Sequence, residues 1–569
     1  MNQTRTFLIF AWLMVATLLW MEWGKEKAAP APTPASSTQP TLPSGGSTVP
    51  GSVPIVPAVP VAAAAAVPGV GAASTTSSPV NVTTDVLRLT LDGGELRDAD
   101  LLRYPRSAER GAPPVQLLAT DPANYFVAQS GWVSSSGPAP THQGGFRVEG
   151  NQTDFRLAAD AQQLVVPFVW TGANGVTIRR TYTFSRGEYV VQVRDEVTNA
   201  GTAPWQGHVY RQLSRVPRAL EKSGPMSAES YSFQGAAWYS STDKYEKSPY
   251  DDFVDEAPLN KPSTGGWIAM LQHHFFAAWI PQATDTSTFS LATPMVGGMP
   301  QYLIRELGPA ISVAPGATAA TQARLWIGPK LVDKIDAQQV PGLDRAVDFS
   351  SSEIMAAIAG ALFKVLSWLH GLFGNWGWAI VGLVVLLKIV MYPLSAAQYK
   401  SMAKMRKFQP RVTQLKERYG EDKQKFQLAL MELYKKEKIN PVGGCLPILL
   451  QMPVFLALYW MLSESVELRH APWIGWITDL TARDMFFVLP AINMAVMWFS
   501  QKLNPTTGMD PMQAKMMQLM PLVFGVMFAF MPAGLVLYWV TNGALGLLQQ
   551  WWMVRLYSEQ PEKPALPGK

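Results

Sequence analysis

The sequence predicts an α-helical polytopic membrane protein with six spans, joined to an all-β sandwich domain. Charged residues make up only 16% of the 569 residues and hydrophobic residues 48%, whereas soluble proteins are nearer a quarter charged. From about residue 350 onward the chain is dominated by long apolar runs, which are typical of membrane spans. Between 81 and 335, short alternating stretches separated by turn signals indicate a β sandwich.

The first segment, 1–23, predicts an N-terminal membrane anchor. Arg5 precedes an apolar run that ends in Met-Glu-Trp rather than in a small-x-small cleavage site. We therefore expect a retained anchor with a cytoplasmic N-terminus, the alternative being a cleaved signal peptide. The Ala/Pro/Ser-rich segment 24–80 that follows cannot bury enough apolar surface to offset the cost of ordering, so we expect a periplasmic tether.

The predicted β domain, 81–335, shows period-two alternation in two places. One face of the first stretch carries Leu87, Leu89 and Leu91, and one face of a later stretch carries Val176, Ile178, Tyr182 and Phe184. Residues 185–188, with Gly187, predict a hairpin turn. Because the domain follows an anchor with its N-terminus inside, we expect it in the periplasm. Cys445 is the single cysteine, so no disulfide can form within the chain.

Residues 349–373 predict an amphipathic helix on the membrane surface. The apolar residues follow helical spacing, at positions Ile354, Ile358, Ala361, Leu362, Val365, Leu366 and Leu369. Lys364 and His370 interrupt the run, which favours an interfacial position over a full span.

Five further spans are predicted, at 376–397, 442–463 and 485–500 and as two halves of 516–553. The last segment is too long for one crossing of about 20 residues, and Pro532 and Gly534 predict a turn within it.

The distribution of basic residues orients these spans. Segment 398–441 holds 12 Lys/Arg and 5 Asp/Glu, whereas 466–484 holds only two basic residues. The positive-inside rule places the first in the cytoplasm and the second in the periplasm. Apolar residues at helical spacing within 398–441 predict an antiparallel helical hairpin, kinked near Pro410. The basic tail 554–569 is also expected in the cytoplasm.

Lys388 is the one formal charge well inside a predicted span. A lysine at the centre of a membrane helix costs about 2.5–3.5 kcal/mol, so such residues usually face a water-filled cavity or a partner. No span contains a central carboxylate to pair with it, which leaves the cation available to an acidic group on a translocating polypeptide. The alternative is a lysine whose stem reaches the cytoplasmic headgroups.

Other residues of the spans allow two interpretations. The polar ones either form bonds between helices or line a hydrophilic groove with Lys388; they are Gln451, Asn493, Ser500, Gln518, Thr541 and Asn542. The apolar ones either pack and face lipid or form a surface along which a nascent helix slides; they are Met452, Phe455, Leu456, Tyr459, Met520, Phe524, Met527 and Phe528.

Motifs of enzymes are absent or weak. There is no P-loop, no H-E-x-x-H and no glycine-rich dinucleotide turn. An S-x-x-K match at 401–404 lacks its companion motifs and is attributed to chance. The six histidines show no spacing typical of metal ligands. We therefore expect no enzyme, cofactor or metal, and no sequence-specific nucleic acid, since the basic residues lie between spans.

Several motifs resemble the YidC branch of the YidC/Oxa/Alb insertase family. In the membrane part they are Met391-Tyr-Pro-Leu394, Gln398-Tyr-Lys-Ser-Met-Ala-Lys-Met-Arg406, Asn440-Pro-Val-Gly-Gly-Cys-Leu-Pro447, Gln451-Met-Pro-Val-Phe455, Asn504-Pro-Thr-Thr507, Asp510-Pro-Met-Gln513 and Gly534-Leu-Val-Leu-Tyr538. In the β domain they are Asp243-Lys-Tyr-Glu-Lys247, Gly265-Gly-Trp-Ile-Ala-Met270 and Leu325-Trp-Ile-Gly-Pro329. The resemblance covers all but roughly 24–80.

The resemblance implies an insertase and chaperone of the bacterial inner membrane, acting on nascent membrane proteins alone or beside the Sec translocon. It also implies that neither nucleotide nor a covalent intermediate is used, and that five of the six spans form the core. A groove open to the cytoplasm carries a basic residue at the position of Lys388, where many relatives have arginine. Positions associated with the groove or with substrate fall on Tyr392, Gln451, Phe455 and Tyr538. The cytoplasmic hairpin and tail would meet ribosomes or targeting factors, and the β domain would be a supersandwich resembling sugar-binding enzymes.

Two other classes of function were weighed. A secondary transporter would have inverted repeats and buried carboxylates, and the sequence shows neither. A carbohydrate-binding or carbohydrate-modifying protein would use clustered carboxylates or histidines in the β domain, and the sequence alone leaves this alternative open.

Overall fold

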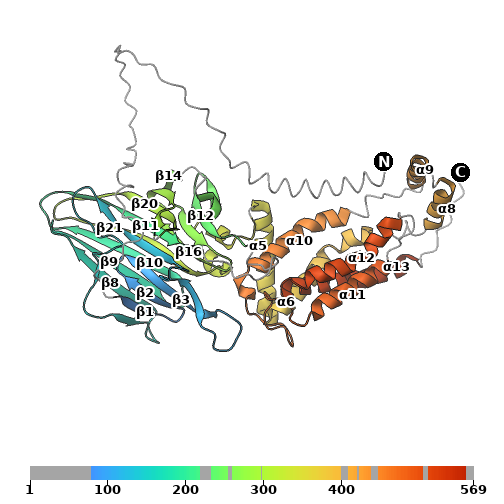
Figure 1. Ribbon diagram of the computed structural model, residues 1–569, viewed down its shortest axis with the longest axis horizontal. Helices are drawn as coiled ribbons and strands as arrows, with labels where there is room; N and C mark the ends of the chain where they lie inside the picture. The colour runs from blue at the N-terminus through green and yellow to red at the C-terminus, as the bar shows by residue number, and fades with distance from the viewer. Residues whose placement is uncertain are drawn as a thin grey trace, which may run out of the picture.

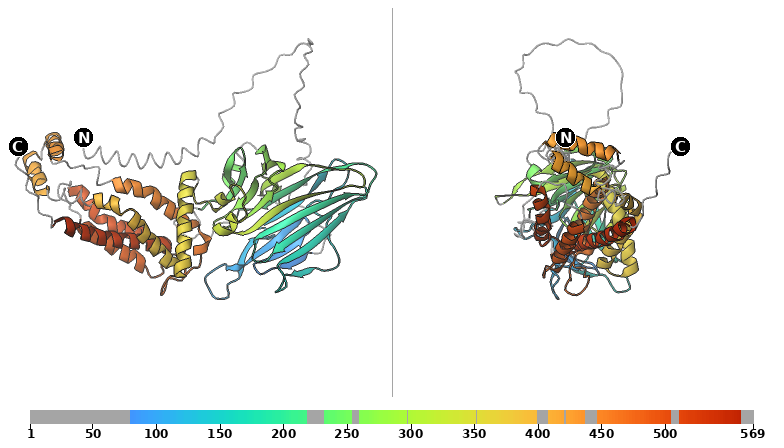
Figure 2. Two further views of the ribbon diagram at one scale, coloured as in Figure 1. Left: turned by 180° about the vertical axis from the view of Figure 1, so that it is seen from behind. Right: turned by 90° about the vertical axis from the view of Figure 1, so that its right-hand side faces the viewer.

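The computed structural model has two parts, a β domain and a group of helices, arranged along one axis (Figure 1). Described residues are 79–217, 232–253, 259–296, 298–350, 352–398, 408–419, 422–436, 446–503 and 511–558. Helix α5 lies crosswise between the two parts, and α8 and α9 lie at the far end of the helices from the β domain (Figures 1 and 2). The predicted anchor 1–23, nearly all of the tether and the tail from 559 onward fall outside the described residues.

Two large sheets form the β domain. The ten-stranded sheet has the order β14-β17-β20-β11-β5-β3-β2-β1-β7, with β4 pairing β3, and the nine-stranded sheet has the order β13-β12-β15-β16-β21-β10-β9-β8-β6. The strands of the larger sheet are β1(Val80–Thr83), β2(Leu87–Asp92), β3(Glu95–Pro105), β4(Pro114–Leu118), β5(Phe126–Ser134), β7(Asp154–Arg156), β11(Trp205–Arg215), β14(Asn260–Thr264), β17(Thr286–Ala292) and β20(Tyr302–Val313). Those of the smaller sheet are β6(Arg147–Val148), β8(Gln163–Thr171), β9(Val176–Ser185), β10(Val190–Asn199), β12(Gly235–Ser240), β13(Lys244–Pro249), β15(Trp267–Leu271), β16(Phe275–Pro281) and β21(Thr318–Pro329).

Smaller elements complete the β domain. They are the two-stranded sheet β18(Met295–Val296) and β19(Met299–Pro300), the 3-10 helices η1(Tyr250–Phe253) and η2(Leu343–Val347), and the helix α4(Val332–Asp336). The first strand begins at Val80, one residue before the predicted start of the domain. The predicted sandwich is confirmed, and its C-terminal edge extends past 335 because η2 also packs into the core, through Leu343, Ala346 and Val347.

Alternation explains how these strands bury one face. The predicted inward residues of β2 and β9 are all buried, whereas Arg88 is exposed. One inward position differs from the expectation, because Arg180 of β9 is also fully buried. Its guanidinium donates two hydrogen bonds of 2.7 Å to Asp195 of β10, which in turn accepts one of 2.7 Å from Trp132 of β5. The interior of the sandwich therefore contains an ion pair within the smaller sheet, and the hydrogen bond from Trp132 links this pair to the larger sheet.

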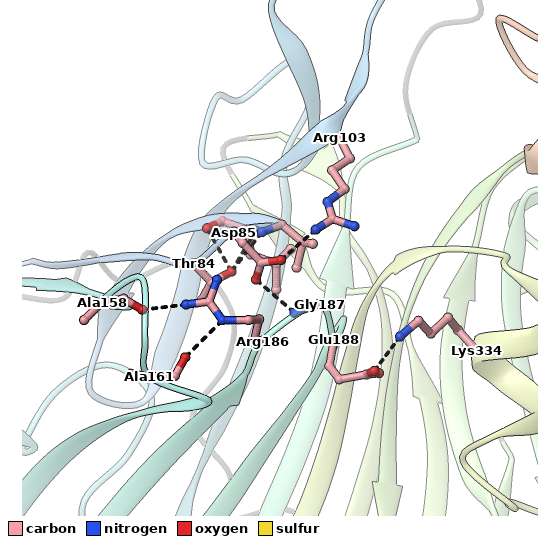
Figure 3. A network of polar contacts seen from close by, with 11 residues as sticks. Thr84, Asp85, Arg103, Ala158, Ala161, Arg186, Gly187, Glu188 and Lys334 are labelled. Carbon is pink, nitrogen blue, oxygen red and sulfur yellow. Dashed lines mark hydrogen bonds and ion pairs between the residues drawn. The ribbon is translucent and has the colours of Figure 1, made fainter.

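The predicted hairpin turn between β9 and β10 is confirmed. Gly187 has φ of +71°, which glycine adopts without strain. Figure 3 shows that Asp85, in the turn before β2, fixes this hairpin by accepting hydrogen bonds from the Gly187 amide and from Arg103. Glu188 at the same turn forms an ion pair with Lys334 of α4 (Figure 3). The turn is thereby tied to the segment that leads from the sandwich to the helices.

The helical part contains α5(Glu353–Phe373), α6(Trp376–Val390), α8(Gln409–Tyr419), α9(Lys423–Lys436), α10(Leu446–Glu464), α11(Val488–Leu503), α12(Pro511–Phe528) and α13(Ala533–Ser558), with η4(Val466–Leu468) after α10. Helices therefore occupy each predicted span after the anchor. The break between α12 and α13 falls at 529–532 and includes Pro532 as expected, whereas Gly534 already lies in α13. Among the described residues, α5 is the single unbroken helix that is long and apolar enough to cross a bilayer. α6 and the helix Tyr392–Gln398 are together also long and apolar enough, with a bend between them. The count of six spans stays a prediction.

Helix α5 packs on α6 and α10 through a narrower stripe than expected. Leu362, Leu366 and Leu369 are buried as predicted, whereas Ile354 is 73% exposed and Ala361 also faces outward. The exposed face carries further apolar side chains, including Trp368 and Leu372. This face therefore lacks the strongly polar character of a typical surface helix, although the interfacial position of α5 remains our expectation.

The predicted cytoplasmic hairpin appears as α8 and α9, which contact each other at the end of the helices far from the β domain (Figure 1). Pro410 lies at the second position of α8, where its missing N–H removes no helical bond. The expected kink near Pro410 would require a helix that continues upstream, into residues 399–407, which lie outside the described residues.

Candidate functional site: Lys388 and the faces of α6, α10 and α13

Lys388 lies in the last turn of α6. The helix ends at Val390 and continues as Tyr392–Gln398 after a bend of 63°. Pro393 explains the bend, because its ring disfavours the helical conformation of the preceding residue and it cannot donate a helical hydrogen bond. The predicted span 376–397 is therefore helical on both sides of a bend, and Tyr392, which is 49% exposed, lies just past the break.

The side chain of Lys388 approaches α13. A Cβ built on Gly546 would lie 3.5 Å from the Lys388 Nζ, so the small residue leaves room for the ammonium group. The helices α6, α10, α11, α12 and α13 contain a single carboxylate, Glu464, at the opposite end of α10 near the β domain. Lys388 is partly buried and forms no ion pair within the described part of the chain.

Two of the predicted groove residues meet between α10 and α13. The side chains of Gln451 and Tyr538 are hydrogen-bonded to each other. The ring of Phe455 stacks on that of Tyr538 with centroids 6.4 Å apart. Tyr538 is only 3% exposed, so the bond satisfies a phenol that would otherwise be buried without a partner.

Polar residues on α13 connect this pair with Lys388. Tyr538, Asn542 and Gly546 are spaced by four residues and lie on the same side of the helix. Eight residues of helix span about 12 Å. Thr541 and Asn542 are half-buried. The α13 face therefore carries polar groups from the Gln451–Tyr538 pair toward the ammonium of Lys388.

Asn493 lies on α11, outside the row on α13. It belongs to α11, is 1% exposed, and its Nδ2 lies 3.7 Å from the Met497 sulfur on the same helix. Its surroundings are those of a residue that packs between helices, which is the alternative weighed for the polar residues of the spans.

The predicted apolar contact residues divide into two groups. Met452 and Met520 are 47% and 39% exposed, whereas Phe455, Tyr459, Phe524 and Met527 pack partly against the core. Sequence reasoning missed Trp539, which lies 4.9 Å from Phe455 and 5.3 Å from Phe528 between ring centroids and so joins α10, α12 and α13. Its position one residue after Tyr538 in an apolar run gave no distinct signal.

Sequence reasoning also missed a docking segment, residues 463–469, through which the helices contact the β domain. His273, before β16, lies with its Nε2 2.9 Å from the Ser463 carbonyl oxygen, and Lys330 lies 3.9 Å from Glu464. Glu467 accepts a hydrogen bond of 3.2 Å from the Val332 amide. The segment therefore touches the end of the sandwich formed by the β15–β16 turn and the residues after β21.

Three further contacts, all made by Arg469, fix the docking segment. Arg469 donates to the carbonyl oxygens of Pro105 and Arg106 at the end of β3, and its guanidinium lies over the Phe275 ring.

Burial in this interface raises the pKa of Glu467 to about 7 and lowers the pKa of His273 to about 4. The histidine is thus neutral near pH 7, and the carboxyl titrates there.

Together, the two parts define a helical membrane-protein domain held at one end by a β sandwich. A family model described as "60Kd inner membrane protein" matches residues 368–560, and one described as "YidC periplasmic domain" matches residues 79–365. The chain is 59% identical to the membrane protein insertase YidC of Stenotrophomonas maltophilia, over 99% of this chain and 98% of that one. It is 58% identical to the YidC of Xanthomonas campestris pathovar campestris over 99% of both.

The chain belongs to the YidC family of membrane protein insertases, an inner-membrane family with a periplasmic domain. A crystal structure of an active YidC insertase with its first transmembrane domain resolved aligns with 83% of this chain and 93% of that chain, at a TM-score of 0.36 and 18% identity.

Proposed function

We propose that this chain inserts newly made proteins into the inner membrane and helps them fold, alone or with the Sec translocon. In this proposal it is not an enzyme and uses neither nucleotide nor a covalent intermediate. The N- and C-termini lie in the cytoplasm, six spans cross the bilayer, and the β domain lies in the periplasm. Helices α8 and α9 lie far from the β domain, which supports the placement of these two parts on opposite sides of the membrane (Figure 1).

The observation that carries the proposal is the placement of Lys388. Its ammonium group lies against α13 with no carboxylate in the neighbouring helices except at the far end of α10. An acidic group on an arriving polypeptide supplies the missing counter-charge, and the attraction between them is much stronger in a low-dielectric environment than in water. We propose that this attraction draws a hydrophilic tail into a groove lined by the polar face of α13.

The exposed methionines would guide the apolar part of the substrate. Met452 and Met520 present flexible thioether chains on α10 and α12, and such side chains adapt to partners of different shape. A nascent helix sliding along this surface would exchange contacts with the insertase for contacts with lipid. Ribosomes or targeting factors would meet the basic hairpin α8–α9 and the tail.

The test is complementation of cells depleted of their own insertase, scored by insertion of a single-span substrate with an acidic periplasmic tail. We expect Lys388→Arg to function, since arginine keeps the charge although its planar fork differs. Lys388→Ala should lower insertion and Lys388→Glu should abolish it. Lys502→Ala is the matched control, because Lys502 lies in the last turn of α11 and its Nζ lies 3.6 Å from the centroid of the Trp498 ring. Equal insertion by all variants at equal expression would refute the role of Lys388.

A further inference from the structure

An apolar hairpin connects β17 and β20 in the β domain. Residues 293–301 contain β18 and β19 and no charged side chain. A hydrogen bond of 2.9 Å from the Gln301 amide to the Pro294 carbonyl closes its base. Met295 and Met299 are 65% and 44% exposed. An uncharged tip with two exposed thioether chains is unusual on a domain whose other large apolar residues are almost all buried.

Strand register places this hairpin at the end of the sandwich that faces the helices. Tyr302, the first residue of β20, pairs with Arg215, the last residue of β11. Arg215 donates a hydrogen bond of 2.6 Å to Gln272. The next residue, His273, contacts the Ser463 carbonyl in the docking segment.

The hairpin connects the end of one long strand pair. β17 ends at Ala292 and β20 begins at Tyr302, with β18 and β19 between them. The opposite end of β20 leads to the turn 314–317, about 40 Å away along a strand of 12 residues. The two ends of one strand therefore offer a site near the membrane domain and a site remote from it.

We propose that the β18–β19 hairpin enters the interfacial layer of the periplasmic leaflet and anchors the β domain on lipid. The inference rests on the family's inner-membrane location, and on continuity between the hairpin and the interface formed by segment 463–469. Apolar side chains gain free energy by leaving water for the boundary between headgroups and acyl chains. A lipid surface suits the hairpin better than a folded partner does, because the tip offers neither a charge nor a concave surface to fix an orientation.

The test uses the full chain reconstituted in bilayers of phosphatidylethanolamine and phosphatidylglycerol. Cys445→Ser removes the native thiol, and Met295→Cys or Ala314→Cys then carries a polarity-sensitive fluorophore. Ala314 is exposed in the remote turn and serves as the matched control. We expect nitroxide-labelled lipids to quench the fluorophore at 295 at least twofold more than that at 314, and aqueous iodide to show the reverse order.

Two results would overturn the proposal. Equal quenching of both positions by iodide, with none by lipid, would leave the hairpin in water. Protection of position 295 from iodide without quenching by lipid would mean that protein covers the hairpin. Either result leaves insertion by the wild-type chain intact, so that failure of the anchor and failure of the insertase function are distinguishable.

Discussion

Removal of the buried carboxylate of Asp195 is expected to destabilise the β domain severely. Asp195 accepts two hydrogen bonds from Arg180 and one from Trp132, all of 2.7 Å, and the exposures of the Asp195 and Arg180 side chains are 3% and 1%. Asp195→Ala leaves the guanidinium buried without its counter-charge, which costs about 3–5 kcal/mol. That is a large part of the roughly 5–15 kcal/mol by which domains are stable.

The same strand supplies the control. Arg194 and Glu196 flank Asp195 on the opposite face of β10 and form an ion pair of 2.9 Å with exposures of 54% and 39%. Exposed pairs contribute about 0–1 kcal/mol, so Arg194→Ala should be nearly neutral. The two variants remove charges from adjacent positions and differ chiefly in burial.

Hydrogen exchange of the full chain, followed by mass spectrometry on peptides of β9 and β10, measures the difference. A loss of 3–5 kcal/mol raises the population of open states by about two to three and a half powers of ten, since 1.4 kcal/mol is tenfold. Arg194→Ala should change exchange by less than about fivefold. If Asp195→Ala exchanges no faster than Arg194→Ala, the buried ion pair does not stabilise the sandwich as we have reasoned.

Two further predictions concern the helices and their docking to the sandwich. The pKa of Glu467 is raised from 4.5 to about 7 by burial, so docking is favoured by the protonated carboxyl and should weaken as the pH rises from about 4.5 through 7. Protection of the Val332 amide from hydrogen exchange should therefore fall over that pH range, and Glu467→Gln should remove this pH dependence. An increase in protection with rising pH would contradict the prediction. Gly377→Ala places a Cβ 2.1 Å from the Trp473 ring. The clash should cost about 1–3 kcal/mol of folding stability and lower the melting temperature by several degrees. Gly371 has open space around it, so Gly371→Ala should not lower the melting temperature. Equal melting temperatures of the two variants would refute the predicted clash.

The sandwich could be predicted because alternation and turn residues carry most of its information. Leu87, Leu89 and Leu91 were placed on the buried face, and Gly187 in the turn, from local pattern alone. The burial of Arg180 could not be predicted from the sequence. A charged residue at an inward position is unfavourable by itself, and its partner Asp195 comes beside it only through the pairing of β9 with β10.

In the helical part, the spacing of apolar residues predicted where helices form but did not predict which helices pack against one another. The Gln451–Tyr538 bond and the approach of Lys388 to Gly546 join residues that lie far apart in the sequence. The bend after Val390 was missed, although Pro393 marks it, because the apolar run continues through the bend. Composition gave no sign of the docking segment, since its contacts with the β domain involve backbone atoms and a few buried polar groups.

The most direct test of the central claim is insertion by the purified chain alone. The full chain is reconstituted into liposomes, a single-span substrate with an acidic tail is synthesised outside them, and insertion is scored by protection of the tail from protease. We predict protection that requires the chain, persists after removal of nucleotide once synthesis is complete, and falls at least severalfold with Lys388→Glu. Protection no greater than in protein-free liposomes would contradict the claim.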